Sequence, residues 1–205
     1  MVTVKVYVEG GGDSNSLRTR CRAGFARFFE KAGLKGRMPR VVACGTRRNA
    51  YDDFCTAILT LGSNEFVALL VDSEGPVAVG QLPWNHLRDR EGDAWEKPAN
   101  ATDDHVHLMV QCMESWFLAD RVSLAEYYGK GFSEKALPDN PKVEEIPKSD
   151  IWENLTRSSR ETQKGPYEKG RHSFEILGRI DPAKVCTAAP FAKRLIDSLL
   201  RVVVS

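Results

Sequence analysis

A short, unbroken apolar run constrains the fold of this chain more than any other feature. Residues 67–71 read Val-Ala-Leu-Leu-Val, and the run ends at Asp72, shortly before Glu74 and a Gly-Pro break. A run of this length bounded by turn residues is typical of a strand buried on both faces of a parallel sheet. Ligands of open α/β sheets bind beyond the carboxyl ends of such strands. Asp72 and Glu74, two apart, would share one face of an extended chain. They indicate either an acidic site at the sheet rim or a strand end with solvated acids.

The segments around this strand alternate between two periodicities. Residues 2–8 alternate valine with polar residues, and residues 40–44 and 105–110 are further short strand candidates. Apolar residues recur at helical spacing over 17–32 and again over 51–61. The order strand, helix, strand, helix, strand predicts right-handed crossovers and a mostly parallel, Rossmann-like sheet flanked by helices.

The last third of the chain has a different character. Residues 130–170 are rich in proline, glycine and charge, which predicts loops with one short helix near 151–156. Apolar spacing predicts further helices from 174 and from 190. We therefore expect an α/β core in residues 1–128 and a loop-rich, helical C-terminal extension in residues 129–205, packed on the core as one compact domain.

Composition limits the classes of function. The 205 residues carry a net charge of +1, so any basic surface for nucleic acid must be local. No apolar run approaches the roughly 20 residues of a membrane span, and no signal segment opens the chain. The five cysteines are scattered without a Cys-x-x-Cys pair. This pattern disfavours zinc and predicts a reducing cytoplasm, and the lack of an apolar span predicts no membrane partner.

Four acidic residues follow or end apolar strand patterns. They are Glu9, Asp72, Glu74 and Glu114. In a parallel sheet these strand ends lie on one edge, where several carboxylates repel one another unless a cation is present. Oxygen ligands suit Mg²⁺, with Mn²⁺ as a substitute. An acid in the first turn of a helix, as Glu114 is expected to be, also has a purely structural explanation in the helix dipole.

Other arrangements that carry chemistry are weaker. The glycines at 10–12 match neither the phosphate-binding loop with its lysine nor the Gly-x-Gly-x-x-Gly dinucleotide motif. His105 and His107 alternate along a strand candidate, and a structural role is favoured over a metal clamp. No spacing indicates a nucleophile with a histidine partner.

Two short motifs resemble those of TOPRIM domains. Residues 8–13, Val-Glu-Gly-Gly-Gly-Asp, are similar to a strand ending in Glu-Gly-x-x-Asp, and residues 71–74, Val-Asp-Ser-Glu, resemble the later Asp-x-Asp motif, with Glu74 in place of aspartate. Residues 113–120 and 169–177 resemble signatures of an uncharacterised bacterial TOPRIM-like family, the domain of unknown function 4276, related in motif to OLD-family nucleases. This second resemblance covers nearly the whole chain.

The resemblance implies a fold, a cofactor and roles for particular residues. It implies a TOPRIM-like sheet, magnesium and phosphodiester cleavage or transfer. Glu9 would act as general base or metal ligand, and Asp72 and Glu74 would hold the metal. A metal role for Glu114 is our own inference, and Asp13 and Asp120 are further candidate acids. Family members are often encoded beside ABC-type or SMC-like ATPases, which suggests a role in defence against phage.

These observations lead to a hypothesis of metal-dependent nuclease activity. A locally basic segment, residues 164–172, offers phosphate contacts through Lys164, Lys169, Arg171 and His172, although an exposed loop explains it equally well. Two alternatives remain. The chain could be a non-catalytic module that binds an ATPase or nucleic acid, or a phosphotransfer module in which Asp72 accepts a phosphoryl group.

Overall fold

Four parallel strands form the centre of the structure. The computed structural model describes residues 2–204. The strands are β1 (Thr3–Gly11), β2 (Arg40–Gly45), β3 (Glu65–Asp72) and β4 (Val106–Met109), in the spatial order β2-β1-β3-β4. The register pairs Val8 of β1 with Leu70 of β3 and Ala43 of β2. All the strands therefore end at the same edge of the sheet, as the α/β prediction requires.

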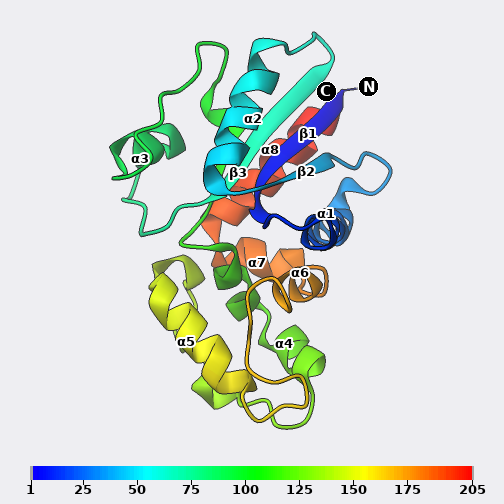
Figure 1. The fold of residues 1–205 in the computed structure, drawn as a ribbon, viewed down its shortest axis with the longest axis vertical. Coiled ribbons are helices and arrows are strands. Elements are labelled where there is room, and N and C mark those ends of the chain that lie inside the picture. Colours follow the sequence, from blue (N-terminus) through cyan, green and yellow to red (C-terminus); the bar gives the residue numbers. More distant parts are fainter. Residues whose placement is uncertain (1, 205) are drawn as a thin grey trace.

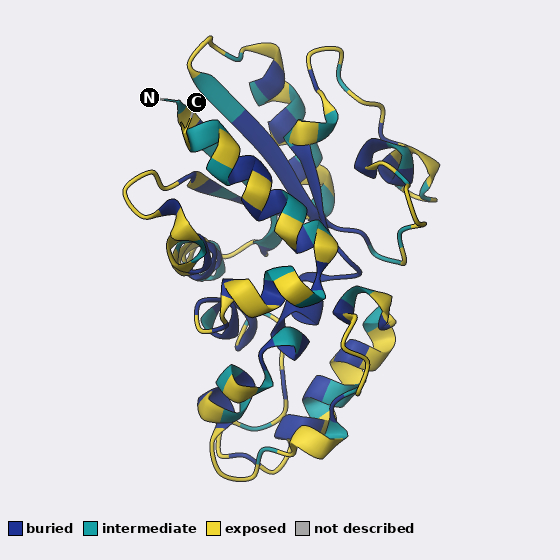
Figure 2. Ribbon diagram, turned by 180° about the vertical axis from the view of Figure 1, so that it is seen from behind, coloured by how far each residue is buried: buried dark blue, intermediate teal, exposed yellow. Residues whose placement is uncertain are grey.

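Successive side chains of the strands point to opposite faces of the sheet and pack into two separate hydrophobic cores. Val4, Val6 and Val8 of β1 pack on one face, while Val67, Leu69 and Val71 of β3 pack on the other. The first face is covered by α1 (Asn15–Phe29) and α8 (Pro190–Val204), and the second by α2 (Arg47–Leu59) and α3 (Pro83–Asp89). Figures 1 and 2 show α2 and α8 on opposite sides of the sheet. Burial on both faces explains the unbroken apolar sequence of β3.

Local signals fix where several helices begin and end. Ser14 caps α1 by accepting the Leu17 N–H, and Asp181 caps α7 (Pro182–Ala188) by accepting that of Ala183. The π-helix η1 (Glu30–Leu34) continues α1 and contains Gly33 at φ 95°, a geometry that favours glycine.

Helices of the C-terminal half gather beyond the carboxyl edge of the sheet. They are α4 (Arg121–Tyr128), α5 (Lys148–Ser159), α6 (Ser173–Leu177) and α7, together with the 3₁₀ helices η3 (Met113–Ala119), η4 (Glu134–Ala136) and η5 (Val143–Glu145). Figure 1 shows this helical group below the strand ends. The final helix, α8, returns to pack against β1 and β4. The C-terminal residues thus complete the core as well as extend it.

Two predicted elements have different bounds in the structure. The strand expected over 105–110 is shorter, because His105 belongs to the 3₁₀ helix η2 (Asp103–His105). The helix expected over 151–156 is longer, since α5 starts at Lys148 directly after Pro147. Among residues 2–204, no helix combines the length and the apolar character needed to cross a membrane.

Candidate metal centre

Three predicted acids meet at the carboxyl edge of the sheet. One carboxylate oxygen from each of Glu9, Asp72 and Glu74 lies within 4.8 Å of the others. Glu9 and Asp72 lie near the ends of β1 and β3, which are adjacent strands. The backbone N–H of Asp72 donates to Glu9 Oε2 at 3.2 Å, so the two strand ends are joined directly. Three oxygen donors this close together form a candidate site for a divalent cation.

Glu74 reaches the cluster by a route that the sequence did not indicate. β3 ends at Asp72, and Glu74 has a left-handed φ of 65°. The argument from alternation in an extended chain is therefore wrong for Glu74. Its N–H donates to Gln111 O at 2.9 Å, which holds the turn against the segment after β4. A left-handed glutamate costs about 1–3 kcal/mol and persists only where its surroundings over-determine it.

The glycines after Glu9 allow the chain to turn tightly beside the site. Gly11 has φ 86°, and a Cβ there would lie 2.9 Å from Arg18 Cα. A Cβ on Gly45, at the end of β2, would lie 2.8 Å from Gly12 O. Both distances are shorter than real Cβ contacts, so side chains here would push the loop away from the strand ends.

Arg47, which the sequence reasoning did not single out, holds several parts of the site together. Its Nη1 lies 3.2 Å from Glu9 Oε2 and also donates to Asp72 O. The rest of the guanidinium binds both oxygens of Asp93, with Nη2 2.6 Å from Oδ2. Its carbon Cζ lies 4.9 Å from the ring centroid of Trp95. The loop after α3 is thereby fastened to the acid cluster.

Two lysines neutralise part of the negative charge. Lys148, the first residue of α5, lies 2.7 Å from Glu74 Oε2 and 3.8 Å from Asp72 Oδ2. Lys169 Nζ lies 3.7 Å from the same Asp72 oxygen. The sequence predicted Lys169 as a phosphate contact, and the structure places it beside the acids. The sequence did not indicate a role for Lys148, because it lies far along the chain from Asp72 and Glu74 and no motif links it to them.

The electrostatics reflect crowding of buried acids. Burial, and then the charges of Glu9 and Glu114, raise the pKa of Asp72 well above its usual value. Burial also raises the pKa of Glu9, although Arg47 acts against it. Burial alone would lower the pKa of Lys169, but the nearby carboxylates outweigh it and the pKa is raised. Such a site favours added positive charge.

Glu114 is buried behind the three-acid cluster. It is 0% exposed, its Oε1 accepts the Tyr167 hydroxyl at 2.7 Å, and its Oε2 has no hydrogen-bond partner within residues 2–204. The helix η3 that carries it is anchored by Trp116, which stacks on Phe28 with ring centroids 5.3 Å apart. The same helix supplies the Met113 N–H that donates to Asp72 Oδ1 at 2.8 Å. Glu114 therefore contributes charge to the site from outside the cluster.

The remaining predicted acids do not join the cluster. Asp13 is exposed in the turn before α1. Asp120 caps α4 and pairs with Lys184, with Oδ1 and Nζ 2.6 Å apart. The structure gives Asp120 a structural role that explains its burial.

The basic segment divides into surface and core. Lys164 is exposed, with Nζ 5.0 Å from the Tyr127 ring centroid, and Arg171 pairs with Glu168 at 3.2 Å. His172 is 3% exposed, and its Nδ1 accepts the Glu168 N–H at 3.1 Å. The predicted phosphate contact by His172 is wrong, because its ring is buried among tyrosines.

Neither strand histidine is placed to clamp a metal. His107 is fully buried, with Nε2 3.1 Å from Asp104 O and Nδ1 3.3 Å from Arg194 Nη1. Burial, followed by Arg194, lowers the pKa of His107 to about 3. His105 Nδ1 accepts the Thr102 N–H. Both rings serve local structure.

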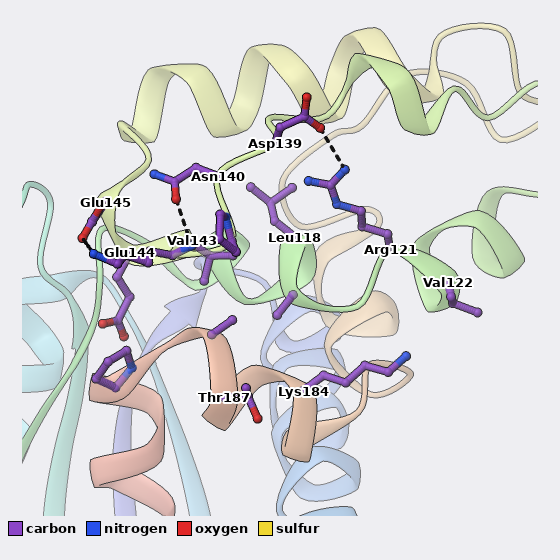
Figure 3. A pocket seen from close by; sticks show the side chains of 15 residues that line it. Leu118, Arg121, Val122, Asp139, Asn140, Val143, Glu144, Glu145, Lys184 and Thr187 are labelled. Carbon is purple, nitrogen blue, oxygen red and sulfur yellow. Dashed lines mark hydrogen bonds and ion pairs between the residues drawn. The ribbon is translucent and has the colours of Figure 1, made fainter.

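A cavity of about 280 Å³ opens beside the acids. Its polar wall includes Glu9, Asp72 and Lys169, and its apolar wall includes Met113 and Phe174. A larger groove of about 950 Å³ lies elsewhere, between η3, η5 and α7, and none of the cluster acids lines it. Figure 3 shows that groove with Leu118 and Val143 in its wall and the Arg121–Asp139 ion pair at its rim. The smaller cavity is the one that adjoins candidate chemistry.

The residues at the strand ends fit a hard divalent cation. All the donors in the cluster are carboxylate oxygens, the ligand type that Mg²⁺ and Mn²⁺ prefer. Four carboxylates, counting Glu114, face the cations Arg47, Lys148 and Lys169. Glu114 Oε2, which has no hydrogen-bond partner within residues 2–204, is a further oxygen near the cluster. The donor set identifies a class of ion and no single metal.

Comparison with known proteins adds one finding. The family model described as domain of unknown function (DUF4276) matches residues 8–200. That range includes the acid cluster and all the helices that surround it. No curated protein matches the chain. No solved structure matches it either. The match covers most of the chain, which therefore belongs to the DUF4276 family.

Proposed function

We propose that this protein is a metal-dependent nuclease that hydrolyses phosphodiester bonds in DNA or RNA. The observation that carries the proposal is the meeting of Glu9, Asp72 and Glu74 within 4.8 Å at the carboxyl ends of parallel strands. The two motifs that resemble those of TOPRIM domains supply these acids, and that relationship is part of the proposal. A bound Mg²⁺ or Mn²⁺ would orient the phosphate and neutralise developing negative charge.

The residues around the cluster have distinct proposed roles. Asp72 and Glu74 hold the cation, with Asp72 Oδ1 fixed by the Met113 N–H. Glu9 either completes the ligand set or accepts a proton from water, and a raised pKa makes it a better base. Lys169, whose side chain is half exposed, contacts the phosphate and stabilises its charge.

Its cellular setting is also proposed. The family resemblance supports action beside an ABC-type or SMC-like ATPase in phage defence. All five cysteines are free thiols, which supports the reducing cytoplasm as the location. Of the alternatives, phosphotransfer to Asp72 fits less well, because that residue is 2% exposed and one of its oxygens is engaged.

The direct test is a cleavage assay on single- and double-stranded DNA and RNA with Mg²⁺ or Mn²⁺, with and without the neighbouring ATPase. We expect cleavage by the wild type and loss of at least about 100-fold in Glu9→Gln and Asp72→Asn, since both are placed at the reacting centre. Asp52→Asn, an exposed acid paired with Arg48, is the matched control and should retain full activity. Equal cleavage by the wild type and both cluster variants would contradict the proposal. A non-catalytic partner of the ATPase would instead show no cleavage and unchanged ATPase binding in Asp72→Asn.

A further inference from the structure

One tryptophan stands apart from the other three. Trp84, Trp95 and Trp116 are buried, at 4%, 3% and 0% exposure, whereas Trp152 on α5 is 37% exposed. Leaving a large aromatic surface in water forgoes the free energy that its burial would provide. Exposure alone is common among surface side chains, and it is the position of Trp152 that distinguishes it.

Trp152 lies next to the acid cluster. Lys148 Nζ is 4.9 Å from the ring centroid, and Lys169 Nζ is 5.4 Å from it. These same ammonium groups lie 2.7 Å from Glu74 Oε2 and 3.7 Å from Asp72 Oδ2, respectively. Each lysine thus bridges the indole and a proposed metal ligand. The sequence of groups outward from the cluster is carboxylate, ammonium and aromatic ring.

The ammonium groups and the aromatic ring match two parts of a nucleotide, its phosphate and its base. A cation attracts phosphate, and an aromatic ring stacks on a base of any identity. Bases inside a duplex have their faces covered by neighbouring pairs, so a protruding side chain stacks on bases that are unpaired. Each lysine is attracted to the indole by a cation–π interaction, and its ammonium group can also bind a phosphate.

We propose that Trp152 stacks on an unpaired base, so that the site takes single-stranded nucleic acid. This inference rests on the proposed function and names its substrate class. The base is held on Trp152 while the adjoining phosphate lies among Lys148, Lys169 and the acid cluster. The chemistry is shared by single-stranded DNA and RNA, and separate probes distinguish them.

The test measures binding of fluorescein-labelled probes by anisotropy, with Ca²⁺ replacing Mg²⁺ to slow cleavage. The probes are oligothymidylate, oligouridylate, an abasic strand of the same length, and a duplex. We expect single strands to bind better than the duplex. Trp152→Ala should weaken binding to whichever single strand is preferred by about 5- to 150-fold, the effect of one lost stacked base, and leave abasic binding unchanged. Trp152→Phe should restore most of the affinity, and Leu59→Ala, which removes an exposed side chain at the far end of α2, should change nothing.

Several outcomes would overturn the inference. They are tighter binding of the duplex, equal affinity of Trp152→Ala and wild type for the base-bearing strands, or an equal loss on the abasic strand. Calorimetric titration with Mn²⁺ separates this failure from that of the proposed function. Absence of Mn²⁺ binding by the wild type would remove the metal site itself. Unchanged Mn²⁺ binding with no effect of Trp152→Ala would remove only the stacking role.

Discussion

Arg47 and Asp93 form a bidentate ion pair, with Nη2 2.6 Å from Oδ2 and Nε 3.0 Å from Oδ1. The pair joins the first turn of α2 to the loop after α3, and Arg47 Nη1 also donates a hydrogen bond to Glu9 Oε2. Both side chains are largely buried, at 14% and 4% exposure. Removing Arg47 takes a cation from Glu9 and leaves the buried Asp93 paired with Arg90, whose Nη1 lies 3.1 Å from Oδ1. Breaking a buried pair in this way is strongly destabilising.

Arg47→Met should therefore destabilise the protein by about 3 kcal/mol, measured by urea unfolding. Arg48→Ala is the control, because its pair with Asp52 is exposed and should contribute less than about 0.5 kcal/mol. The double variant Arg47→Met/Asp93→Leu should recover part of the loss. Similar stabilities for Arg47→Met and Arg48→Ala would refute the bracing role.

Asp72→Asn should raise the melting temperature of the metal-free protein at pH 7. The folded state raises the pKa of Asp72, through burial and then Glu9, so its ionised form costs stability as pH rises above the unfolded value of 3.8. Asparagine keeps the acceptor for the Met113 N–H without the charge. With Mn²⁺ at a hundredfold excess over its dissociation constant, the wild type should gain about 2.7 kcal/mol and the variant none. Melting curves in EDTA and in Mn²⁺ measure both effects, and a variant that gains as much as the wild type from Mn²⁺ would contradict the metal role.

Glycine should be better tolerated than alanine at position 74. Both variants lose the carboxylate, but alanine keeps the cost of a left-handed backbone (φ 65°) and glycine does not. Glu74→Gly should therefore be more stable than Glu74→Ala by about 1–2 kcal/mol in urea unfolding. Ala94, at φ 47°, is a matched control: Ala94→Gly should be stabilising. If both position-74 variants are equally stable, the strain argument fails. Because Glu74→Gly and Glu74→Ala each lack the carboxylate, both variants should lose Mn²⁺ affinity.

Glu144 should make stability depend on pH. Burial raises its pKa from 4.5 to about 7, while its Oε1 accepts the Phe191 N–H at the start of α8. Between pH 4.5 and 7 the unfolded carboxyl ionises and the folded one resists, so stability falls as pH rises through this window. Glu144→Gln keeps an acceptor and removes this dependence. It should match the wild type near pH 4 and exceed it at pH 8, as measured by urea unfolding at each pH. A gap of constant size at all pH values would contradict this assignment.

The sequence by itself determined the parallel α/β sheet and the edge on which Glu9 and Asp72 would meet. Both follow from local rules: a doubly buried strand is an unbroken apolar run, and parallel strands end on one edge. Capping by Ser14 and Asp181 is equally local, because their hydrogen bonds span only a few residues.

Only the tertiary structure decided what surrounds the acids. Arg47 and Lys148 come from segments predicted as loops, and Trp152 comes from a short predicted helix. Packing of α2 and α5 brings all three to the site. Packing likewise buried His172 and set Asp120 against Lys184. Contacts between residues far apart in sequence depend on how whole elements pack, and local periodicity does not determine that packing.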